Sequence, residues 1–169
     1  TGAEVRTLAD HVDAINAIAY SPDGKTIATG ASDRTVKLWN AETGERQITL
    51  SDSADAVLCL AISPDGHYLA AGAADKRIRV WDLEASGKSF MQTGLTSGVL
   101  KASTFAHNGP VQLLRYAPDG ATLYSAADDM RVKAWDTATM TEKTQFEEQP
   151  DTVLAMALSP DGKALAVGR

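Results

Sequence analysis

The chain has 169 residues and a formal net charge of −6, and 44% of its residues are hydrophobic and 22% charged. These proportions are typical of a globular protein and exclude a wholly disordered one. The net negative charge disfavours a general nucleic-acid surface, because neutralising phosphates needs clustered Lys and Arg. No uncharged apolar run reaches about 18 residues, which excludes a membrane-spanning helix. The first residues also lack the basic segment and apolar core of a signal peptide. We therefore expect a soluble protein with no nucleic-acid partner and no membrane partner.

The first candidate element in chain order is residues 4–8. It stands before the first long alternating segment as residues 46–50 stand before the second, so it predicts an outer strand without the rest of its sheet. Period-two alternation then predicts strands over residues 15–20, 26–29, 35–39 and 46–50. Three short turns separate them, which indicates a four-stranded antiparallel meander.

The turn motif Ser-Pro-Asp-Gly, once Ala-Pro-Asp-Gly, shows that this unit repeats. It begins at Ser21, Ser63, Ala117 and Ser159, with spacings of 42, 54 and 42 residues. Trp39, Trp81 and Trp135 keep the same spacings. Proline presets the backbone, and glycine accepts the left-handed conformation that such a hairpin needs. Two markers at equal offsets predict a repeat of about 42 residues, with a 12-residue insertion in its second copy.

The third predicted strand of each complete repeat ends in Trp-Asn or Trp-Asp, at residues 39–40, 81–82 and 135–136. Four-stranded units of this length and ending resemble the WD-repeat β-propeller family. The resemblance implies an all-β fold of four-stranded antiparallel blades arranged as a β-propeller, incomplete within this chain. The expected division is an orphan outer strand in 4–10, blade units 11–52, 53–106 (insertion near 84–100) and 107–148, and a truncated unit 149–169.

One set of residues has the composition of a hydrolase triad: His107, Ser125 and Asp129. An equivalent set occurs at the same offsets in the first repeat, with Thr in place of Ser. Two copies in separate units of one repeat favour a structural function, and the family resemblance implies a hydrogen-bonded tetrad that includes the tryptophan of each of these units. The two predicted tetrads are His11, Thr29, Asp33 and Trp39, and His107, Ser125, Asp129 and Trp135.

The second repeat departs from this pattern. Its aligned positions hold Ser53 and Ala71, so only Asp75 and Trp81 remain of a tetrad, and we expect its turn to be held less firmly. The fourth repeat has Gln149 and Val167 at the aligned positions. No catalytic residue, no metal ligand set and no cofactor is predicted. Cys59 aligns with small apolar residues and is expected to be buried.

Binding of a protein or peptide partner is the function that the resemblance implies. The candidate contact residues lie in the loops before the first strands and after the second strands: Asp13, Ser32, Asp55, Asn108, Asp128 and Asp151. Their acidic balance favours a basic segment. Within the insertion, Phe90 and Met91 form a candidate apolar anchor, with a lengthened hairpin as the alternative.

The leading hypothesis is therefore a non-catalytic interaction scaffold. Two alternatives remain: a sensory or regulatory propeller domain of a larger bacterial protein, and an enzyme that uses the propeller funnel. Because blades are apolar on both faces and must stack on neighbours, the remaining blades are expected from the same longer protein or from a second copy.

Overall fold

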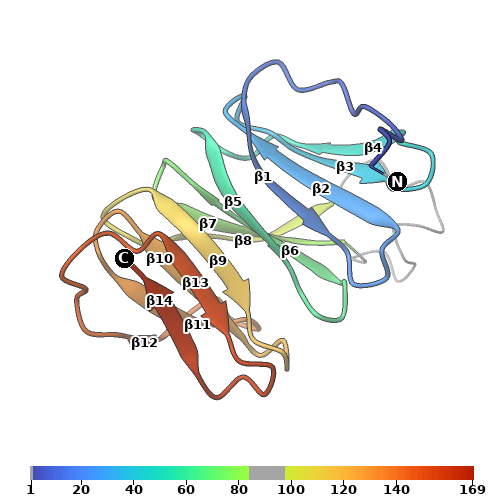
Figure 1. Cartoon of the computed structure of the whole chain (residues 1–169). Helices are drawn as coiled ribbons and strands as arrows, with labels where there is room; N and C mark the ends of the chain where they lie inside the picture. The colour runs from blue at the N-terminus through green and yellow to red at the C-terminus, as the bar shows by residue number, and fades with distance from the viewer. Residues whose placement is uncertain (1, 84–97) are drawn as a thin grey trace.

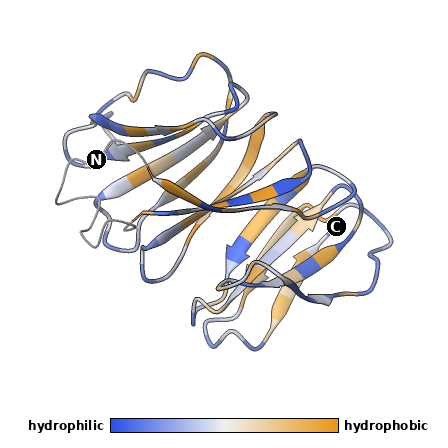
Figure 2. Cartoon of the chain, turned by 180° about the vertical axis from the view of Figure 1, so that it is seen from behind, coloured by the Kyte–Doolittle hydropathy of each residue, from blue (hydrophilic) through white to orange (hydrophobic). Residues whose placement is uncertain are grey.

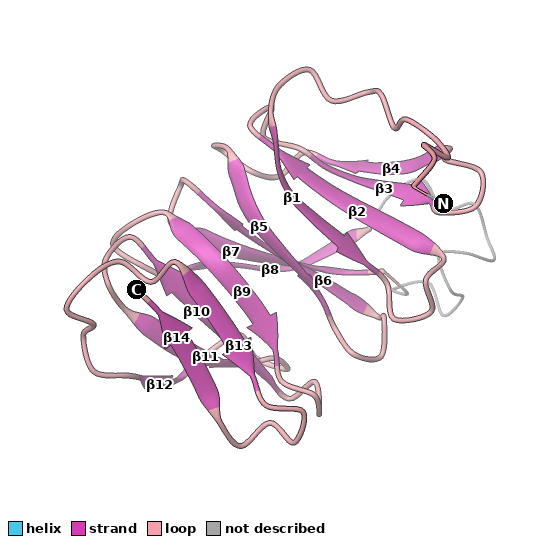
Figure 3. Ribbon diagram, in the orientation of Figure 1, coloured by secondary structure: helices cyan, strands magenta, loops and turns pink. Residues whose placement is uncertain are grey.

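The computed structural model describes residues 2–83 and 98–169, and every regular element in this part of the chain is a β-strand (Figure 3). Three antiparallel sheets have four strands each, and the last sheet has two. The first sheet consists of β1 (Ile15–Tyr20), β2 (Thr26–Ala31), β3 (Val36–Asn40) and β4 (Arg46–Leu50). The second consists of β5 (Val57–Ile62), β6 (Tyr68–Ala73), β7 (Arg77–Asp82) and β8 (Val99–Phe105). The third consists of β9 (Val111–Tyr116), β10 (Thr122–Ala127), β11 (Val132–Asp136) and β12 (Glu142–Gln145), and the last of β13 (Ala155–Leu158) and β14 (Leu165–Gly168).

The sheets stand in a row, with the two termini at opposite ends (Figure 1). The first strands are neighbours along one side of the row, because β1 contacts β5, β5 contacts β9 and β9 contacts β13. The fourth strands β4, β8 and β12 form the other edge of their sheets. The predicted all-β class and incomplete propeller are confirmed.

Each tryptophan of the repeat occupies the same place in its sheet. Trp39 lies opposite Ile27, Trp81 opposite Leu69 and Trp135 opposite Leu123. In the pairing with the fourth strand, a register shift lies directly before each tryptophan. All three indoles are at most 3% exposed. The repeated Trp therefore marks a repeated packing position.

The hydrophobic core is divided among the spaces between successive sheets. Between the first two sheets, Val36 and Leu38 pack with Val57, Leu60 and Trp81. Equivalent clusters lie between the second and third sheets and between the third and the two-stranded sheet. Figure 2 shows the hydrophobic residues along the strands and the hydrophilic ones mostly in the loops. Each sheet is thus stabilised by its neighbours.

The Pro-Asp-Gly turns have the predicted geometry. Gly24, Gly66, Gly120 and Gly162 have φ between 70° and 79°. A Cβ at Gly66 would lie 3.7 Å from Pro22 Cδ, one at Gly120 would lie 3.8 Å from Pro64 Cδ, and one at Gly162 would lie 3.2 Å from Pro118 Cδ. The turn of each unit therefore contacts the turn of the unit before it.

One strand expectation is wrong. Residues 2–14 contain no strand, so the outer strand predicted within residues 4–10 is absent from the structure. An outer strand is held by backbone hydrogen bonds to a third strand, as β4 is by β3, and no described third strand lies beside residues 4–8. Side chains bond in this segment instead: Arg6 donates to the backbone carbonyl of Glu42 in the turn between β3 and β4, and within the segment Thr7 Oγ1 donates to Glu4 Oε1 at 2.6 Å.

Candidate functional site

The structure brings the four residues of the third-unit set together. The indole Nε1 of Trp135 donates to Ser125 Oγ at 2.8 Å, and Ser125 Oγ lies 2.7 Å from His107 Nε2. On the other side of the ring, His107 Nδ1 lies 3.0 Å from Asp129 Oδ1. Asp129 also accepts from the backbone amide of Asn108 at 2.8 Å. The relay therefore joins the loop before β9 to the second and third strands of the same sheet.

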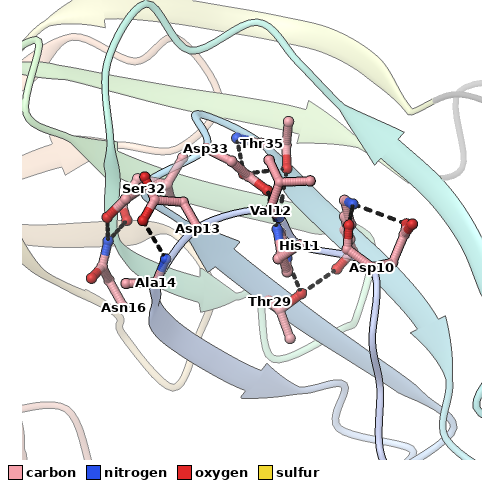
Figure 4. Close-up of polar contacts among 12 residues, drawn as sticks. Asp10, His11, Val12, Asp13, Ala14, Asn16, Thr29, Ser32, Asp33 and Thr35 are labelled. Carbon is pink, nitrogen blue, oxygen red and sulfur yellow. Dashed lines mark hydrogen bonds and ion pairs between the residues drawn. The ribbon is translucent and has the colours of Figure 1, made fainter.

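The first unit contains the same relay, of which Figure 4 shows His11, Thr29 and Asp33. Trp39 Nε1 donates to Thr29 Oγ1 at 2.8 Å, Thr29 Oγ1 lies 2.7 Å from His11 Nε2, and His11 Nδ1 lies 2.8 Å from Asp33 Oδ2. Asp33 accepts in addition from the Thr35 hydroxyl at 2.6 Å and from its amide at 3.0 Å. Burial alone would raise the pKa of Asp33, but these hydrogen bonds and that of His11 lower it well below its usual value.

The contacts of His107 suit a neutral imidazole. Ser125 Oγ accepts from the Trp135 indole and can donate its own proton to His107 Nε2, and His107 Nδ1–H can then donate to Asp129. Burial lowers the pKa of His107 and outweighs the opposing effect of the Asp129 carboxylate.

Ser125 and His107 are less accessible to a substrate than the serine and histidine of a hydrolase must be. Ser125 is 0% exposed and His107 is 1% exposed. A cavity of about 360 Å³ lies beside His107 and Asp129, but Ser125 is not part of its lining. A nucleophilic serine must reach a substrate carbonyl next to an oxyanion hole. This geometry supports the structural function of the tetrads.

The second unit replaces the histidine with an arginine that the sequence analysis did not identify. Arg79 donates to both carboxylate oxygens of Asp75, with Nη1–Oδ1 at 3.1 Å and Nη2–Oδ2 at 2.5 Å. Both side chains are largely buried, at 5% and 13% exposure. Burial alone would raise the pKa of Asp75, but Arg79 lowers it. Trp81 Nε1 donates to Asp52 Oδ2 at 2.8 Å.

The tetrad of the second unit is thus reduced to Asp75 and Trp81, as the sequence indicates, but both side chains have other partners, Arg79 and Asp52. The signal in the sequence is Arg79 itself, since the first and third units have Lys37 and Lys133 at that position. Lysine cannot form the bidentate contact of a guanidinium with a carboxylate. The less firmly held turn of the second unit stays a prediction, and the Asp75–Arg79 pair is the contact that opposes it.

The loop face is the surface that runs along the whole row and is formed by the loops before β1, β5, β9 and β13 and those after β2, β6 and β10. Asp13, Asp55 and Asp151 are exposed and take the same local conformation there. One oxygen of each accepts the amide of the next residue at 2.7, 2.8 and 2.7 Å, respectively. The carboxylates are thus fixed in orientation while they remain open to solvent.

Asp128 stands at the rim of a cavity on the loop face. Its Oδ2 accepts from Gln112 Nε2 at 3.0 Å, and the cavity, of about 380 Å³, is lined by both residues together with Leu154 and three neighbours. Leu154 is 72% exposed. The acidic group therefore adjoins an apolar surface.

The other candidate contact residues differ in position. Ser32 Oγ accepts from Asn16 Nδ2 at 3.0 Å, and the same nitrogen donates to the Val57 carbonyl at 2.9 Å, so Ser32 belongs to a link between the first two units. Asn108 is exposed on the loop face. Phe90 and Met91 lie outside the described residues.

The cysteine, the potential metal ligands and the membrane-spanning potential of the described residues were also considered in the sequence. Cys59 is buried as predicted; burial raises the pKa of its thiol to about 12, and its Sγ donates to the Val111 carbonyl at 3.3 Å. Across residues 2–83 and 98–169, His, Cys, Asp and Glu form no group of three suited to a metal ion. The same residues include no helix with the length and apolarity to cross a membrane.

Comparison with known proteins agrees with this geometry. The model of the family "WD domain, G-beta repeat" matches residues 2–40, 44–82 and 98–136, which is more than half of the chain. The chain therefore belongs to the WD-repeat family. Proteins of this family generally act as scaffolds for protein interactions and are typically not enzymes.

Relatives that match most of the chain are much longer proteins. Periodic tryptophan protein 2 of Saccharomyces cerevisiae is 37% identical over 93% of the chain, and protein HIR1 of Kluyveromyces lactis is 26% identical over 95%. Nuclear distribution protein PAC1 of Coccidioides posadasii is 27% identical over 80% of the chain. The chain spans 20%, 14% and 31% of the length of these relatives, respectively.

Proposed function

We propose that this chain is a non-catalytic interaction scaffold whose loop face binds a basic segment of a protein or peptide. The observation that carries the proposal is the presentation of exposed carboxylates from successive units on a single rigid face. Asp13, Asp55 and Asp151 occupy equivalent loops, and Asp128 adds a fourth carboxylate between the last two.

Two further features support this proposal. The relays and the Asp75–Arg79 pair hold the loops of the first three units in place, so little conformational entropy is lost when a partner binds. The cavity between Asp128 and Leu154 offers an acidic and an apolar wall, which suits the charged end and the aliphatic stem of Lys or Arg.

Titration with capped peptides tests the proposal. A Lys- and Arg-containing peptide is expected to shift the amide resonances of the loop face and to bind more weakly as salt is raised, whereas a Glu-containing peptide of equal length is not. Asp55→Asn combined with Asp128→Asn is expected to reduce the affinity by about tenfold. Asp119→Asn, at an exposed Pro-Asp-Gly turn on the opposite end of the units, is the matched control. Equal binding of both peptides, or equal loss in the control, would refute the proposal.

We infer in addition that further blade units complete the row, from the same longer protein or from a second copy. Ile15 and Ile18 of β1 are 51% and 64% exposed, whereas the aligned Val57 and Leu60 of β5 are 0% and 6% exposed because the preceding sheet covers them. The outer face of the first sheet is therefore apolar and exposed, whereas the equivalent face of the second sheet is covered by the first sheet.

A further inference from the structure

The loop before β9 contains the pair Asn108–Gly109, which is the only Asn-Gly pair of the sequence. The backbone nitrogen that follows an asparagine can attack the carbon of the side-chain amide and expel ammonia. Glycine favours this reaction, because it has no side chain that hinders ring closure and its backbone reaches more conformations than that of any other residue. The reacting atoms are the Gly109 nitrogen and Asn108 Cγ.

Neither reacting group is held by a hydrogen bond. Asn108 contacts the neighbouring turn through its backbone amide, which donates to Asp129 Oδ2 at 2.8 Å. Within residues 2–83 and 98–169, no hydrogen bond of the Asn108 side chain or of the Gly109 amide is found. Asn108 is exposed and lines a cavity of about 360 Å³. Its side chain can therefore turn toward the Gly109 nitrogen without the loss of a bond, and water has access to the product.

The other two asparagines are held by their side chains. Asn16 Nδ2 donates to Ser32 Oγ at 3.0 Å, and Asn40 Oδ1 accepts from the amide of Glu42 at 2.8 Å. An alanine follows each of them. Ring closure at either position would break a hydrogen bond and would be hindered by the alanine Cβ. Asn108 is therefore expected to be the most reactive of the three.

The aspartates of the four Pro-Asp-Gly turns are also followed by glycine, but there both groups are held. The glycine amide of each turn donates to the carbonyl of the residue that opens the turn, at 2.9 Å in all four cases. Each aspartate accepts the amide of the second residue after it at 2.9 to 3.1 Å. An ionised carboxylate is moreover a poorer electrophile than an amide. The free pair in the loop before β9 therefore differs from these turns.

The reaction needs no reagent other than water. The Gly109 nitrogen forms a bond to Asn108 Cγ, the bond from Cγ to Nδ2 breaks, and the amide proton leaves with the side-chain nitrogen as ammonia. Water then opens the cyclic succinimide at one of its two carbonyls. Opening at Cγ gives aspartate. Opening at the backbone carbonyl gives isoaspartate, in which the main chain runs through the former side chain, and both products carry a carboxylate in place of the amide.

The third unit is also the one whose loop lacks an aspartate of its own. At the position where the other three units have Asp13, Asp55 and Asp151, it has Gly109. A Cβ at Gly109 would lie 2.8 Å from the backbone nitrogen of Asp129, so no side chain fits there. A carboxylate one residue earlier would supply the charge that this position cannot carry.

We propose that Asn108 is a site of spontaneous deamidation, which yields aspartate and isoaspartate and adds one negative charge to the loop before β9. This modification goes beyond the proposed binding function and does not depend on it. Isoaspartate inserts one main-chain atom before Gly109, where even an added Cβ would be too close to Asp128 and Asp129. The isoaspartate form is therefore expected to loosen the turn between β10 and β11, whereas the aspartate form keeps the length of the main chain.

Incubation of the folded chain at mildly alkaline pH, followed by tryptic peptide mapping, tests the proposal. Cleavage after Lys101 and Arg115 releases residues 102–115, in which Asn108 is the only asparagine. We expect this peptide to acquire the mass of the acid and to separate into aspartate and isoaspartate forms. Its conversion is expected to be faster than that of Asn16 and Asn40 by about tenfold or more, and tenfold is a barrier lower by about 1.4 kcal/mol. A sample digested without incubation corrects for conversion during the digest.

Two variants separate the reaction from its consequences. Asn108→Gln is the matched control, because ring closure from the longer side chain is much slower, and it is expected to give no acid form. Asn108→Asp carries the charge without the extra main-chain atom. The Asp128 amide, which donates to the Pro110 carbonyl at 3.0 Å, reports on the turn in hydrogen exchange. It is expected to lose protection in the isoaspartate form and to keep it in Asn108→Asp.

Three outcomes would contradict the proposal. The first is an unchanged Asn108 in the folded chain under conditions that convert a synthetic peptide of residues 102–115. The second is conversion of Asn16 or Asn40 at the rate of Asn108, which would remove the role of the free side chain and the following glycine. The third is equal protection of the Asp128 amide in the isoaspartate form and in Asn108→Asp, which would refute the loosened turn. Melting curves recorded before and after incubation establish that the chain stays folded.

Discussion

The buried histidine of the third unit has a consequence for stability as pH changes. His107 is neutral in the folded chain and burial lowers its pKa, so the unfolded chain binds the extra proton more readily. Stability is therefore expected to fall as pH decreases below the unfolded histidine pKa of about 6.5, by at most about 1.4 kcal/mol per pH unit.

Urea unfolding at pH 7 and pH 5.5 measures this effect. His107→Gln cannot be protonated and is expected to reduce the difference between the two pH values, although the loss of the relay lowers its stability at both. His67→Gln, at an exposed position of the second Pro-Asp-Gly turn, is the control and is expected to leave the difference unchanged. A pH difference that persists in His107→Gln would contradict the assignment.

The left-handed backbone conformation of Met130 is expected to lower the stability of the folded chain. Met130 has φ of 60°, and Arg34 and Lys76 take the same left-handed conformation at the aligned positions after Asp33 and Asp75. A side chain in this region is strained by about 1 kcal/mol. Met130→Gly is expected to raise the free energy of unfolding by about that amount, less any packing lost with the side chain.

The reverse substitution is the control. Gly24 has φ of 71°, and a Cβ there would meet nothing within 4 Å, so Gly24→Ala introduces strain without a clash. It is expected to lower the free energy of unfolding by about 1 kcal/mol. Urea midpoints of the two variants that move in the same direction would argue against strain as the cause.

At the scale of the elements, the Asp75–Arg79 pair contacts the loop of the second unit that the relays hold in the first and third units. Arg79→Met would leave Asp75 largely buried without its partner, and we expect it to lower the free energy of unfolding by about 3 kcal/mol. Lys37→Met, at the aligned position, breaks a pair with the more exposed Asp10 and is expected to have a smaller effect.

Hydrogen exchange of the loop between β6 and β7 provides the local measurement. In Arg79→Met this loop is expected to lose protection before the aligned loops of the first and third units do. A triple variant that carries Ser53→His, Ala71→Thr and Arg79→Lys recreates the residues of the first-unit relay and is expected to restore part of the protection. Equal protection of the loop in Arg79→Met and the unsubstituted chain would exclude this role of the arginine.

At the scale of the whole molecule, the ends of the row differ from its interior. Ile18 and Leu60 are aligned residues, one 64% exposed and the other 6% exposed. Ile18→Lys is expected to change the free energy of unfolding by less than about 0.5 kcal/mol and to reduce any self-association in sedimentation velocity. Leu60→Lys places a charge between two sheets and is expected to unfold the chain. Similar losses of stability in both variants would contradict the exposed face.

Much of this arrangement could be predicted from the sequence because it depends on local chemistry repeated at fixed spacing. The Pro-Asp-Gly turns, the alternating strands and the tryptophans recur at 42 or 54 residues, and two relays follow from equal offsets. Arg79 was missed because the aligned Lys37 and Lys133 pair with other carboxylates, Asp10 and Glu142, so the repeat offsets do not indicate its contact with Asp75. Residues 4–8 were assigned a strand by analogy with β4, although a strand also needs a neighbour to pair with.

The contacts between successive Pro-Asp-Gly turns have a consequence for how such a chain can change in length. At each joint, meaning the contact between the turns of two successive units, a proline of one turn lies against the glycine of the next. Duplication or deletion of one whole 42-residue module would therefore recreate joints of a kind already present, without any compensating substitution. A gain or loss of half a module would instead leave a sheet without its outer strands.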